Sequence, residues 1–275
     1  MNDIYNRRNT IFCVERESDR YPEKIAVHKG MPRKLWYMGR MPDPNRKSVA
    51  IVGARRSTAY GNAMAKLFAE HLAEAGVQII SGMAWGIDSY AHEGALKADG
   101  DTFAVLGCGV DVCYPAGQRH LYECLKEKGG ILSEQPPGRP PLAGFFPARN
   151  RIISALSDLV LVIEAREKSG SLITADAALE QGKDVYAVPG RFGDVLSDGC
   201  NALIGQGAGI IYDLDIFLQN LGYLPEKNVE TTKIKNISLF FVRRNHKNHS
   251  KFLTRCCLHT ITLPINIGIK QDNTE

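Results

Sequence analysis

Short apolar runs alternate with segments of helical periodicity between residues 48 and 213. The run Ser-Val-Ala-Ile-Val-Gly at 48–53 is apolar almost throughout and stops at a glycine, which predicts a buried strand. The next segment repeats its apolar residues at helical spacing and ends at Gly76. That repeat comprises Met64, Leu67, Phe68, Leu72 and Ala75. A strand followed by an amphipathic helix is therefore the first predicted unit.

The same alternation continues along the chain. Further strands are predicted at 77–81, 102–106, 131–133, 159–164, 184–188 and 209–212, and helices at 87–98, 118–128, 149–157, 171–181 and near Asn201. Strands that are apolar throughout, each followed by a helix, are typical of a parallel sheet covered on both faces. The predicted fold class is α/β, a doubly wound, mostly parallel Rossmann-like sheet over residues 46–222.

The two ends of the chain do not share this pattern. Residues 1–45 contain several prolines and are predicted to form a short, extended N-terminal lead-in. Residues 223–275 mix short apolar runs with basic residues, and no domain, winged helix included, is predicted in this irregular tail. Its composition would suit a truncated or frame-shifted end.

The positive net charge of the chain does not by itself indicate that the main domain binds an anion, because the charge is unevenly distributed. The formal net charge is +4, but residues 228–275 hold eight Lys and Arg against three Asp and Glu. The preceding residues therefore carry 26 basic side chains against 27 acidic ones, a net charge of −1. Anion binding by the main domain must come from local groups of residues rather than from its overall field.

Composition also narrows the setting of the protein. No apolar run is long enough to cross a bilayer, and residues 1–20 lack the apolar core of a signal peptide. None of the seven cysteines forms a CxxC pair, so neither a zinc site nor any other metal or cofactor is predicted. We expect a cytoplasmic protein with reduced thiols and no membrane partner.

Ligands of open parallel sheets bind beyond the carboxyl ends of the strands, so the loops there are the candidate site. The first loop begins Gly53-Ala-Arg55-Arg-Ser57. Arg55 stands where a dinucleotide fingerprint needs its second glycine, which disfavours a dinucleotide. An arginine can instead fork onto a phosphate beside the N–H groups of a helix start. The alternative is an ordinary exposed loop arginine.

Other loops on the same edge supply glycines and hydroxyl groups. Glycines near a helix start allow tight turns and present backbone N–H groups to an anion. Ser169, Gly170 and Ser171 offer an anion-binding helix start, with plain helix capping as the equal alternative. The remaining candidates in these loops are Ser81, Gly82, Gly86, Gly107 and Gly109.

The segment Phe145-Phe-Pro-Ala-Arg-Asn-Arg151 carries the strongest signal. Arg149 and Arg151 fall at the predicted start of a helix, where the dipole disfavours a cation by up to about 1 kcal/mol. Such a local cost is expected where function overrides folding preference, and a bound phosphate would relieve it. Phe146 could stack on a base, worth about 1–3 kcal/mol, although one of the two phenylalanines is expected in the core.

Five loops on one sheet edge thus favour binding of a polyanion. The candidate nucleic-acid-binding residues are Gly53, Arg55, Ser57, Ser81, Gly82, Gly86, Gly107, Gly109, Phe146, Arg149, Asn150, Arg151, Ser169, Gly170 and Ser171. The chain lacks GxSxG, HExxH and GxxxxGK[ST] motifs, so no catalytic residue is predicted and an enzyme is not expected.

Taken together, these stretches resemble the DprA/Smf family of DNA-processing proteins. The matching segments are 48–55, 81–88, 107–115, 146–154, 162–165, 169–174, 187–190 and 199–204, and they occur in family order over roughly residues 21–213. The resemblance implies a homodimeric Rossmann-like protein that binds single-stranded DNA in a basic pocket. It further implies protection of incoming DNA in natural transformation and loading of a RecA-type recombinase. Arg55 would be a phosphate ligand, and Arg149, Asn150 and Arg151 would line the same pocket.

Three alternatives stay open at this point. A nucleoside-monophosphate phosphoribohydrolase would share the sheet but need a PGGxGT-like loop, and 187–191 lacks its second glycine and threonine. A dinucleotide-dependent oxidoreductase is disfavoured by Arg55. A purely structural dimer module would leave the arginines at the helix start unexplained. The chain also has Ala54 where relatives often have a hydroxyl residue.

Overall fold

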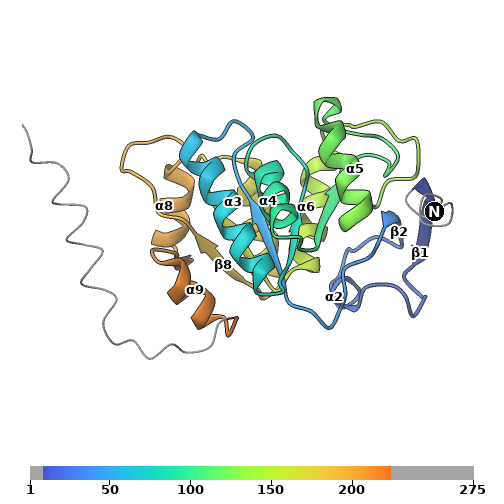
Figure 1. Ribbon diagram of the computed structural model, residues 1–275, viewed down its shortest axis with the longest axis horizontal. Helices are drawn as coiled ribbons and strands as arrows, with labels where there is room; N and C mark the ends of the chain where they lie inside the picture. Colours follow the sequence, from blue (N-terminus) through green and yellow to red (C-terminus); the bar gives the residue numbers. More distant parts are fainter. Residues whose placement is uncertain (1–8, 224–275) are drawn as a thin grey trace, which may run out of the picture. The chain divides into compact units, whose positions relative to one another are not determined.

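The computed structural model describes residues 9–223, which form a nine-stranded sheet with helices packed on it (Figure 1). The strand order is β1-β2-β6-β5-β4-β3-β7-β8-β9, and all neighbours from β6 to β9 pair in parallel. The parallel strands are β3 (Ser48–Val52), β4 (Gln78–Ser81), β5 (Thr102–Leu106), β6 (Gly130–Ser133), β7 (Leu159–Val162), β8 (Asp184–Ala187) and β9 (Gly209–Ile210). The predicted doubly wound, mostly parallel Rossmann-like sheet is confirmed.

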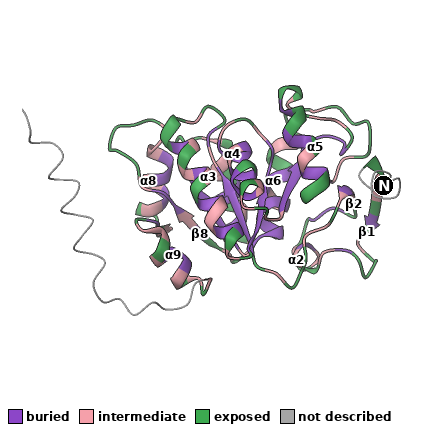
Figure 2. Ribbon diagram, in the orientation of Figure 1, coloured by how far each residue is buried: buried purple, intermediate pink, exposed green. Residues whose placement is uncertain are grey.

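Both faces of the sheet carry helices because alternate side chains of each buried strand point to opposite sides. Ala50 and Val52 of β3 pack in one apolar cluster, whereas Val49 and Ile51 pack in another. Figure 2 shows the central strands buried between helices that are exposed on their outer sides. The helices are α3 (Ala59–Glu74), α4 (Ile87–Lys97), α5 (Arg119–Lys128), α6 (Phe145–Leu156), α7 (Gly170–Glu180), α8 (Asp198–Gly205) and α9 (Leu214–Asn220), with a 3-10 turn, η1 (Ala116–Gln118), before α5.

Helix α6 begins four residues earlier than the sequence pattern predicts, at Phe145 rather than Arg149. Pro147 lies in the first turn, where its missing N–H costs no helical hydrogen bond, so the helix can include it. Arg149 and Arg151 therefore lie beyond the first turn. The predicted unfavourable interaction between these two cations and the helix dipole is therefore wrong.

The lead-in is more regular than its composition suggests. It contains β1 (Phe12–Glu15), α2 (Glu23–Ala26) and β2 (Lys34–Gly39), and β2 pairs antiparallel with β6. Leu35 and Met38 of β2 are buried. The short strands were hidden by the turns and prolines between them. The prediction for the irregular tail falls almost wholly on residues 224–275, which lie outside the described residues.

A partly buried ion pair connects helix α2 to the amino end of the parallel sheet. Lys24 Nζ lies 2.9 Å from a carboxylate oxygen of Asp158 and donates to Ser48 Oγ at 2.9 Å. Asp158 also accepts a hydrogen bond from the Ser48 backbone N–H. The lead-in is thus tied to the start of β3, at the end of the sheet opposite the loops that follow the strands.

The chain reverses its direction of winding at β3. Strands β4, β5 and β6 follow on one side of β3, and β7, β8 and β9 follow on the other. The loops after β3 and β7 consequently diverge and leave a crevice between them, where open α/β sheets bind their ligands. Within residues 9–223 no helix is long and apolar enough to span a membrane.

Candidate nucleic-acid interface

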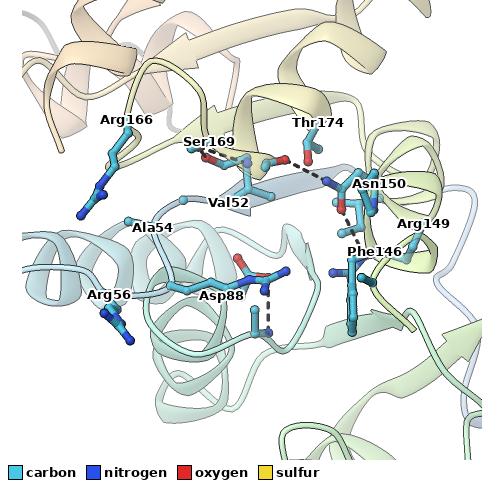
Figure 3. Close-up of a pocket in the computed structure, with 18 of the residues that line it drawn as sticks. Val52, Ala54, Arg56, Asp88, Phe146, Arg149, Asn150, Arg166, Ser169 and Thr174 are labelled. Atoms are coloured by element: carbon cyan, nitrogen blue, oxygen red, sulfur yellow. Dashed lines mark hydrogen bonds between the residues drawn. The ribbon is translucent and has the colours of Figure 1, made fainter. Parts of the chain in front are cut away.

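A pocket of about 720 Å³ occupies this crevice at the carboxyl ends of β3 and β7. Its walls come from the loops that follow β3, β4, β5, β6, β7 and β8, from the first half of α6 and from the start of α7. Figure 3 shows Arg56 and Arg166 on one side of the pocket and Phe146 and Asn150 on the other. The pocket is thus bounded by cations on one wall and by an aromatic ring on the facing wall.

Arg55 and two aromatic rings form a column along the pocket. The Arg55 guanidinium carbon lies 5.4 Å from the centroid of the Phe146 ring. Phe146 in turn lies 5.4 Å from Tyr114, with 34° between the ring planes. At this distance the guanidinium makes a cation–π contact with the ring, which positions the charge of Arg55 beside the pocket. Arg55 and Tyr114 are exposed and Phe146 is partly buried, so the column is open to a ligand.

Two further arginines at the pocket were not among the predicted site residues. Arg56 and Arg166 are both exposed and both line the pocket. Each lies next to a loop that the sequence had marked, since Arg56 follows Arg55 and Arg166 precedes Ser169 by three residues. Basic residues in loops directly after buried strands are the signal that could have identified them.

Arg149 is a buried structural cation rather than an exposed ligand. Its side chain is 4% exposed, and Nη1 donates to the Gly82 carbonyl at 2.9 Å and to the Val105 carbonyl. Nε donates to Asn150 Oδ1 at 3.2 Å. The guanidinium therefore joins α6 to the ends of β4 and β5 and forms the floor of the pocket.

Burial lowers the pKa of Arg149 to about 10, which leaves it charged at neutral pH. The same burial raises the pKa of Asp88, an effect that the nearby Arg149 charge opposes. The Asp88 carboxylate accepts hydrogen bonds from the backbone N–H groups of Gly82 and Ala84. Asp88 thus shapes the loop between β4 and α4, in addition to its position in the first turn of the helix.

Arg151 does not reach the pocket. Its Nη1 and Nη2 donate to the two carboxylate oxygens of Glu134 at 3.0 and 2.8 Å, and Nε donates to the Gly30 carbonyl at 3.0 Å. A guanidinium held in a two-point ion pair has little left to offer a phosphate. The expected placement of Arg151 beside Arg149 in the pocket is therefore wrong.

The start of α3 is also occupied from within the protein. Glu164 at the end of β7 accepts hydrogen bonds from the backbone N–H of Thr58, at 2.8 Å, and from the Thr58 hydroxyl. Thr58 Oγ1 accepts from the Gly61 N–H at 3.1 Å, and a Cβ at Gly61 would lie 2.4 Å from the Glu164 carboxyl group. The Thr58 N–H is thus engaged by the Glu164 carboxylate and the Gly61 N–H by the Thr58 hydroxyl, and the negative charge of Glu164 disfavours a phosphate at this helix start.

The start of α7 has the helix cap that was one of its two alternatives, and anion binding there stays a prediction. Ser169 caps the helix by accepting from the Ser171 N–H at 3.2 Å, and Ser169, Gly170 and Ser171 all line the pocket. Asn150 Nδ2 donates to the Gly170 carbonyl at 2.9 Å and so ties α6 to α7. Thr174, one turn further on, also lines the pocket.

Two of the marked glycines make room for side chains rather than for a ligand. A Cβ at Gly82 would lie 2.6 Å from Arg149 Nη1, and one at Gly107 would lie 2.9 Å from the Phe146 ring. Glycine at these two positions therefore leaves space for the Arg149 guanidinium and for the Phe146 ring. This packing role differs from the close backbone approach to an anion that the sequence suggested.

The predicted site residues fall into four groups. The 720 Å³ pocket is lined by Gly53, Arg55, Phe146, Arg149, Asn150, Ser169, Gly170 and Ser171. Gly82 and Gly107 line a small adjoining pocket, and Ser57 and Gly86 line a neighbouring groove; both share Arg55 with the first pocket. Ser81, Gly109 and Arg151 line none of these three cavities. Ser81 is buried, and its hydroxyl donates to the Ile51 carbonyl.

No group of three or more His, Cys, Asp or Glu residues placed to hold a metal occurs among residues 9–223. The cysteines in this part of the chain are all free: Cys13, Cys108, Cys113, Cys124 and Cys200. Burial raises the pKa of Cys108 to about 11, so this thiol stays protonated near neutral pH.

The sequence of this chain is similar to a known protein family and to several of its members. The family model for DNA recombination-mediator protein A matches residues 12–222. Protein Smf of Escherichia coli is 43% identical over 211 residues, which cover 76% of this chain and 56% of that protein. DNA processing protein DprA of Streptococcus pneumoniae is 42% identical over 193 residues, covering 70% of this chain and 68% of the relative.

Solved structures give the same result. The structure of DprA from Streptococcus pneumoniae superposes with a TM-score of 0.72 at 37% identity, covering 79% of this chain and 77% of that one. DprA from Helicobacter pylori, described for its single-stranded DNA binding mode, superposes with a TM-score of 0.69 at 33% identity. That alignment covers 77% of this chain and 95% of the other.

Proposed function

The chain belongs to the DNA recombination-mediator protein A family, DprA/Smf, and from this we propose that it binds single-stranded DNA in the 720 Å³ pocket. The observation that carries the proposal is the column formed by Arg55, Phe146 and Tyr114. A cation beside exposed aromatic surfaces is the combination that holds a phosphate and the base next to it.

The geometry favours a single strand over a duplex. An aromatic ring can stack on a base only when that base has left its own stack and its pairing partner, which duplex DNA does not offer without cost. The exposed arginines Arg55, Arg56 and Arg166 lie around the pocket, where the sugar–phosphate chain would pass. The proposed ligand set includes these three cations and Phe146, and leaves Arg151 out.

The wider role rests on the family alone. This chain spans 56% of the length of the Escherichia coli relative, so the activities of the whole relatives are carried over only as proposals. We propose that the protein acts in the cytoplasm as a homodimer, protects incoming DNA during natural transformation and helps to load a RecA-type recombinase. Residues 224–275 have no role in this proposal.

We further propose that the site binds without catalysis. Glu164, the carboxylate at the end of β7, is engaged with Thr58 and the start of α3. The competing activity, hydrolysis of nucleoside monophosphates by a phosphoribohydrolase, predicts that adenine is released from AMP. We expect no release after prolonged incubation, followed by chromatography. Adenine formation that rises with protein concentration would support the enzyme instead.

The binding proposal is tested with Arg55→Ala and a fluorescein-labelled oligothymidylate in a fluorescence anisotropy titration. We expect the affinity to fall at least tenfold, because the variant loses one charge-assisted phosphate contact and the cation that stacks on Phe146. Arg20→Ala is the matched control, since Arg20 is also exposed but lies in the turn between β1 and α2. Equal affinities for the two variants would remove Arg55 from the site, and no binding by the unaltered protein would refute the function.

A further inference from the structure

A second cavity, a groove of about 800 Å³, adjoins the pocket. Arg55 and Arg56 line both cavities, so the two are continuous along these side chains. The rest of the groove comes from Ser57, the loop between β4 and α4, and the elements α3, α4, η1 and α5. A strand held by Arg55 in the pocket therefore has a second cavity directly beside it.

Trp85 stands at this groove with an unusual degree of exposure. Its side chain is 52% exposed in the loop between β4 and α4. The ring lies against the backbone of η1, since a Cβ at Gly117 would lie 2.9 Å from Trp85 Cζ2. Glycine thus leaves room for the ring to rest there. A tryptophan supported by backbone and otherwise open to solvent is a suitable platform for a base.

Gln118 provides the second, independent observation. It lines the groove, is 6% exposed, and its side-chain Nε2 and Oε1 have no hydrogen-bond partner among the described residues. Leaving a buried amide unpaired is costly, which is why almost all such groups are paired in folded proteins. An amide can accept and donate side by side, as the hydrogen-bonding edge of a nucleobase requires. Because Gln118 lines the groove, a nucleobase bound there would give its amide the partner that it lacks.

The charges of the groove favour an anion. Its one carboxylate, Glu93, is paired with Lys66 at 2.6 Å, and Lys97 is paired with Glu70 at 2.7 Å. The positive and negative charges within each of these two ion pairs cancel. Arg55 and Arg56 therefore set the sign of the field at the boundary with the pocket.

We propose that this groove is a second nucleobase subsite, which takes the neighbouring nucleotide of the strand held in the pocket. The base stacks on Trp85, its edge meets the Gln118 amide, and the phosphate between the two nucleotides lies at Arg55 and Arg56. The inference rests on the proposed function, because it assigns a second position to the same bound strand.

The chain has two tryptophans, Trp36 and Trp85, which allows a direct optical test. Trp36→Phe leaves Trp85 as the only tryptophan, and we expect its fluorescence to be quenched as oligothymidylate is added. Trp85→Phe is the matched control, because Trp36 lies in β2 beside Ser133 of β6 and lines none of the three cavities. The quench should be absent in this control.

Anisotropy of labelled oligothymidylate, measured on the same samples, separates the two proposals. Binding without a change in Trp85 fluorescence would overturn the second subsite and leave the proposed function standing. Absence of binding by the unaltered protein would instead refute the function itself.

The length of the ligand gives a second test. Trp85→Ala should weaken the binding of a ten-nucleotide oligothymidylate about tenfold, as expected for the loss of one base-stacking contact. It should not change the binding of thymidine 3′,5′-bisphosphate, because this ligand has a single base, which occupies the 720 Å³ pocket beside Phe146. Equal losses for the two ligands, or no loss for the longer one, would overturn the assignment of Trp85.

Gln118→Leu tests the amide. Removing an unpaired buried polar group should raise the melting temperature of the free protein, because the substitution keeps the volume and removes the unmet hydrogen bonds. The same variant should bind oligothymidylate several-fold more weakly, with no loss toward an abasic oligonucleotide of equal length. The same loss for both oligonucleotides, or unchanged binding of both, would overturn the contact to a base.

Discussion

At the scale of single residues, the neighbouring cations of the pocket have different functions. Arg55 is exposed and stacked on Phe146, whereas Arg149 is buried and bonded to the carbonyl groups of Gly82 and Val105. One cation is presented to a ligand, and the other maintains the fold beneath it. Substitution should therefore separate the effects on binding from those on stability.

Arg149→Leu should lower the free energy of unfolding by about 3–5 kcal/mol, because it removes the charge that compensates the buried Asp88 and the hydrogen bonds to two carbonyl groups. Arg55→Ala should change it by no more than about 0.5 kcal/mol, as at most exposed positions. Urea titrations followed by circular dichroism would measure both. A similar loss in the two variants would contradict the division of roles.

His92 should make the stability of the fold depend on pH in the acid range. Burial, with a smaller contribution from the Arg149 charge, lowers the pKa of His92 to about 3. Between about pH 6.5 and pH 3 the unfolded chain binds a proton at this position that the folded protein does not. Stability should therefore fall as the pH falls through this range, by up to about 1.4 kcal/mol per unit. His92→Gln should show a shallower dependence in urea titrations at several pH values, and an identical slope would contradict the assignment.

Residue types and loop positions identified much of the site before its geometry was known. Eight of the predicted residues line the 720 Å³ pocket. The errors concern partners that are distant in the sequence: Glu134 for Arg151 lies 17 residues away, Gly82 for Arg149 lies 67 away, and Glu164 for Thr58 lies 106 away. Local pattern contains no information about such contacts, so it could not tell a free arginine from an engaged one.

At the scale of elements, α3 depends on a strand for its start. Thr58 caps the helix and Glu164 from the end of β7 binds Thr58 in turn. Thr58→Ala should destabilise the protein by about 1–2 kcal/mol, in the usual range for a lost cap. Glu164→Gln should also destabilise it, because an uncharged amide accepts more weakly than a carboxylate.

The two substitutions should be less than additive in a double-mutant cycle, since they remove parts of one network. Thermal or urea unfolding of the single and double variants would measure the coupling. Strict additivity would show that the cap and the carboxylate act independently.

Apolar runs predicted the parallel strands well because both faces of these strands are buried. Every residue of β3, β4, β5, β6 and β7 is buried, so no alternation was needed to recognise them. Strands β1 and β2 lie at the antiparallel edge with mixed burial, and their short, interrupted pattern did not stand out. The early start of α6 was missed because Pro147 reads as a breaker, although it is harmless in a first turn.

At the scale of the molecule, the position of the site follows from topology. The reversal of winding at β3 sets the loops after β3 and β7 apart, and the arginines are carried on those loops. Residues 1–227 have a net charge of −1, so the domain as a whole does not attract DNA. Binding must come from the few cations gathered at the crevice.

The salt dependence of binding should reflect that small number. If Arg55, Arg56 and Arg166 neutralise about three phosphates, the logarithm of the association constant should fall with the logarithm of salt concentration at a slope of about −2. Arg55→Ala should make the slope shallower by about 0.7. Anisotropy titrations at several salt concentrations would give both slopes. A slope near zero in the unaltered protein would contradict phosphate contacts.

The pairing of β2 with β6 sets a lower limit on how far the protein can be shortened. Deleting residues 9–45 would uncover the backbone hydrogen-bonding groups of β6, expose apolar surface next to Leu35 and Met38, and break the Lys24–Asp158 tie. An uncovered sheet edge of this kind invites strands of other molecules to add to it. The smallest version that stays monodisperse should therefore begin at or before Glu23, the first residue of α2, although the proposed DNA contacts all lie after Val52.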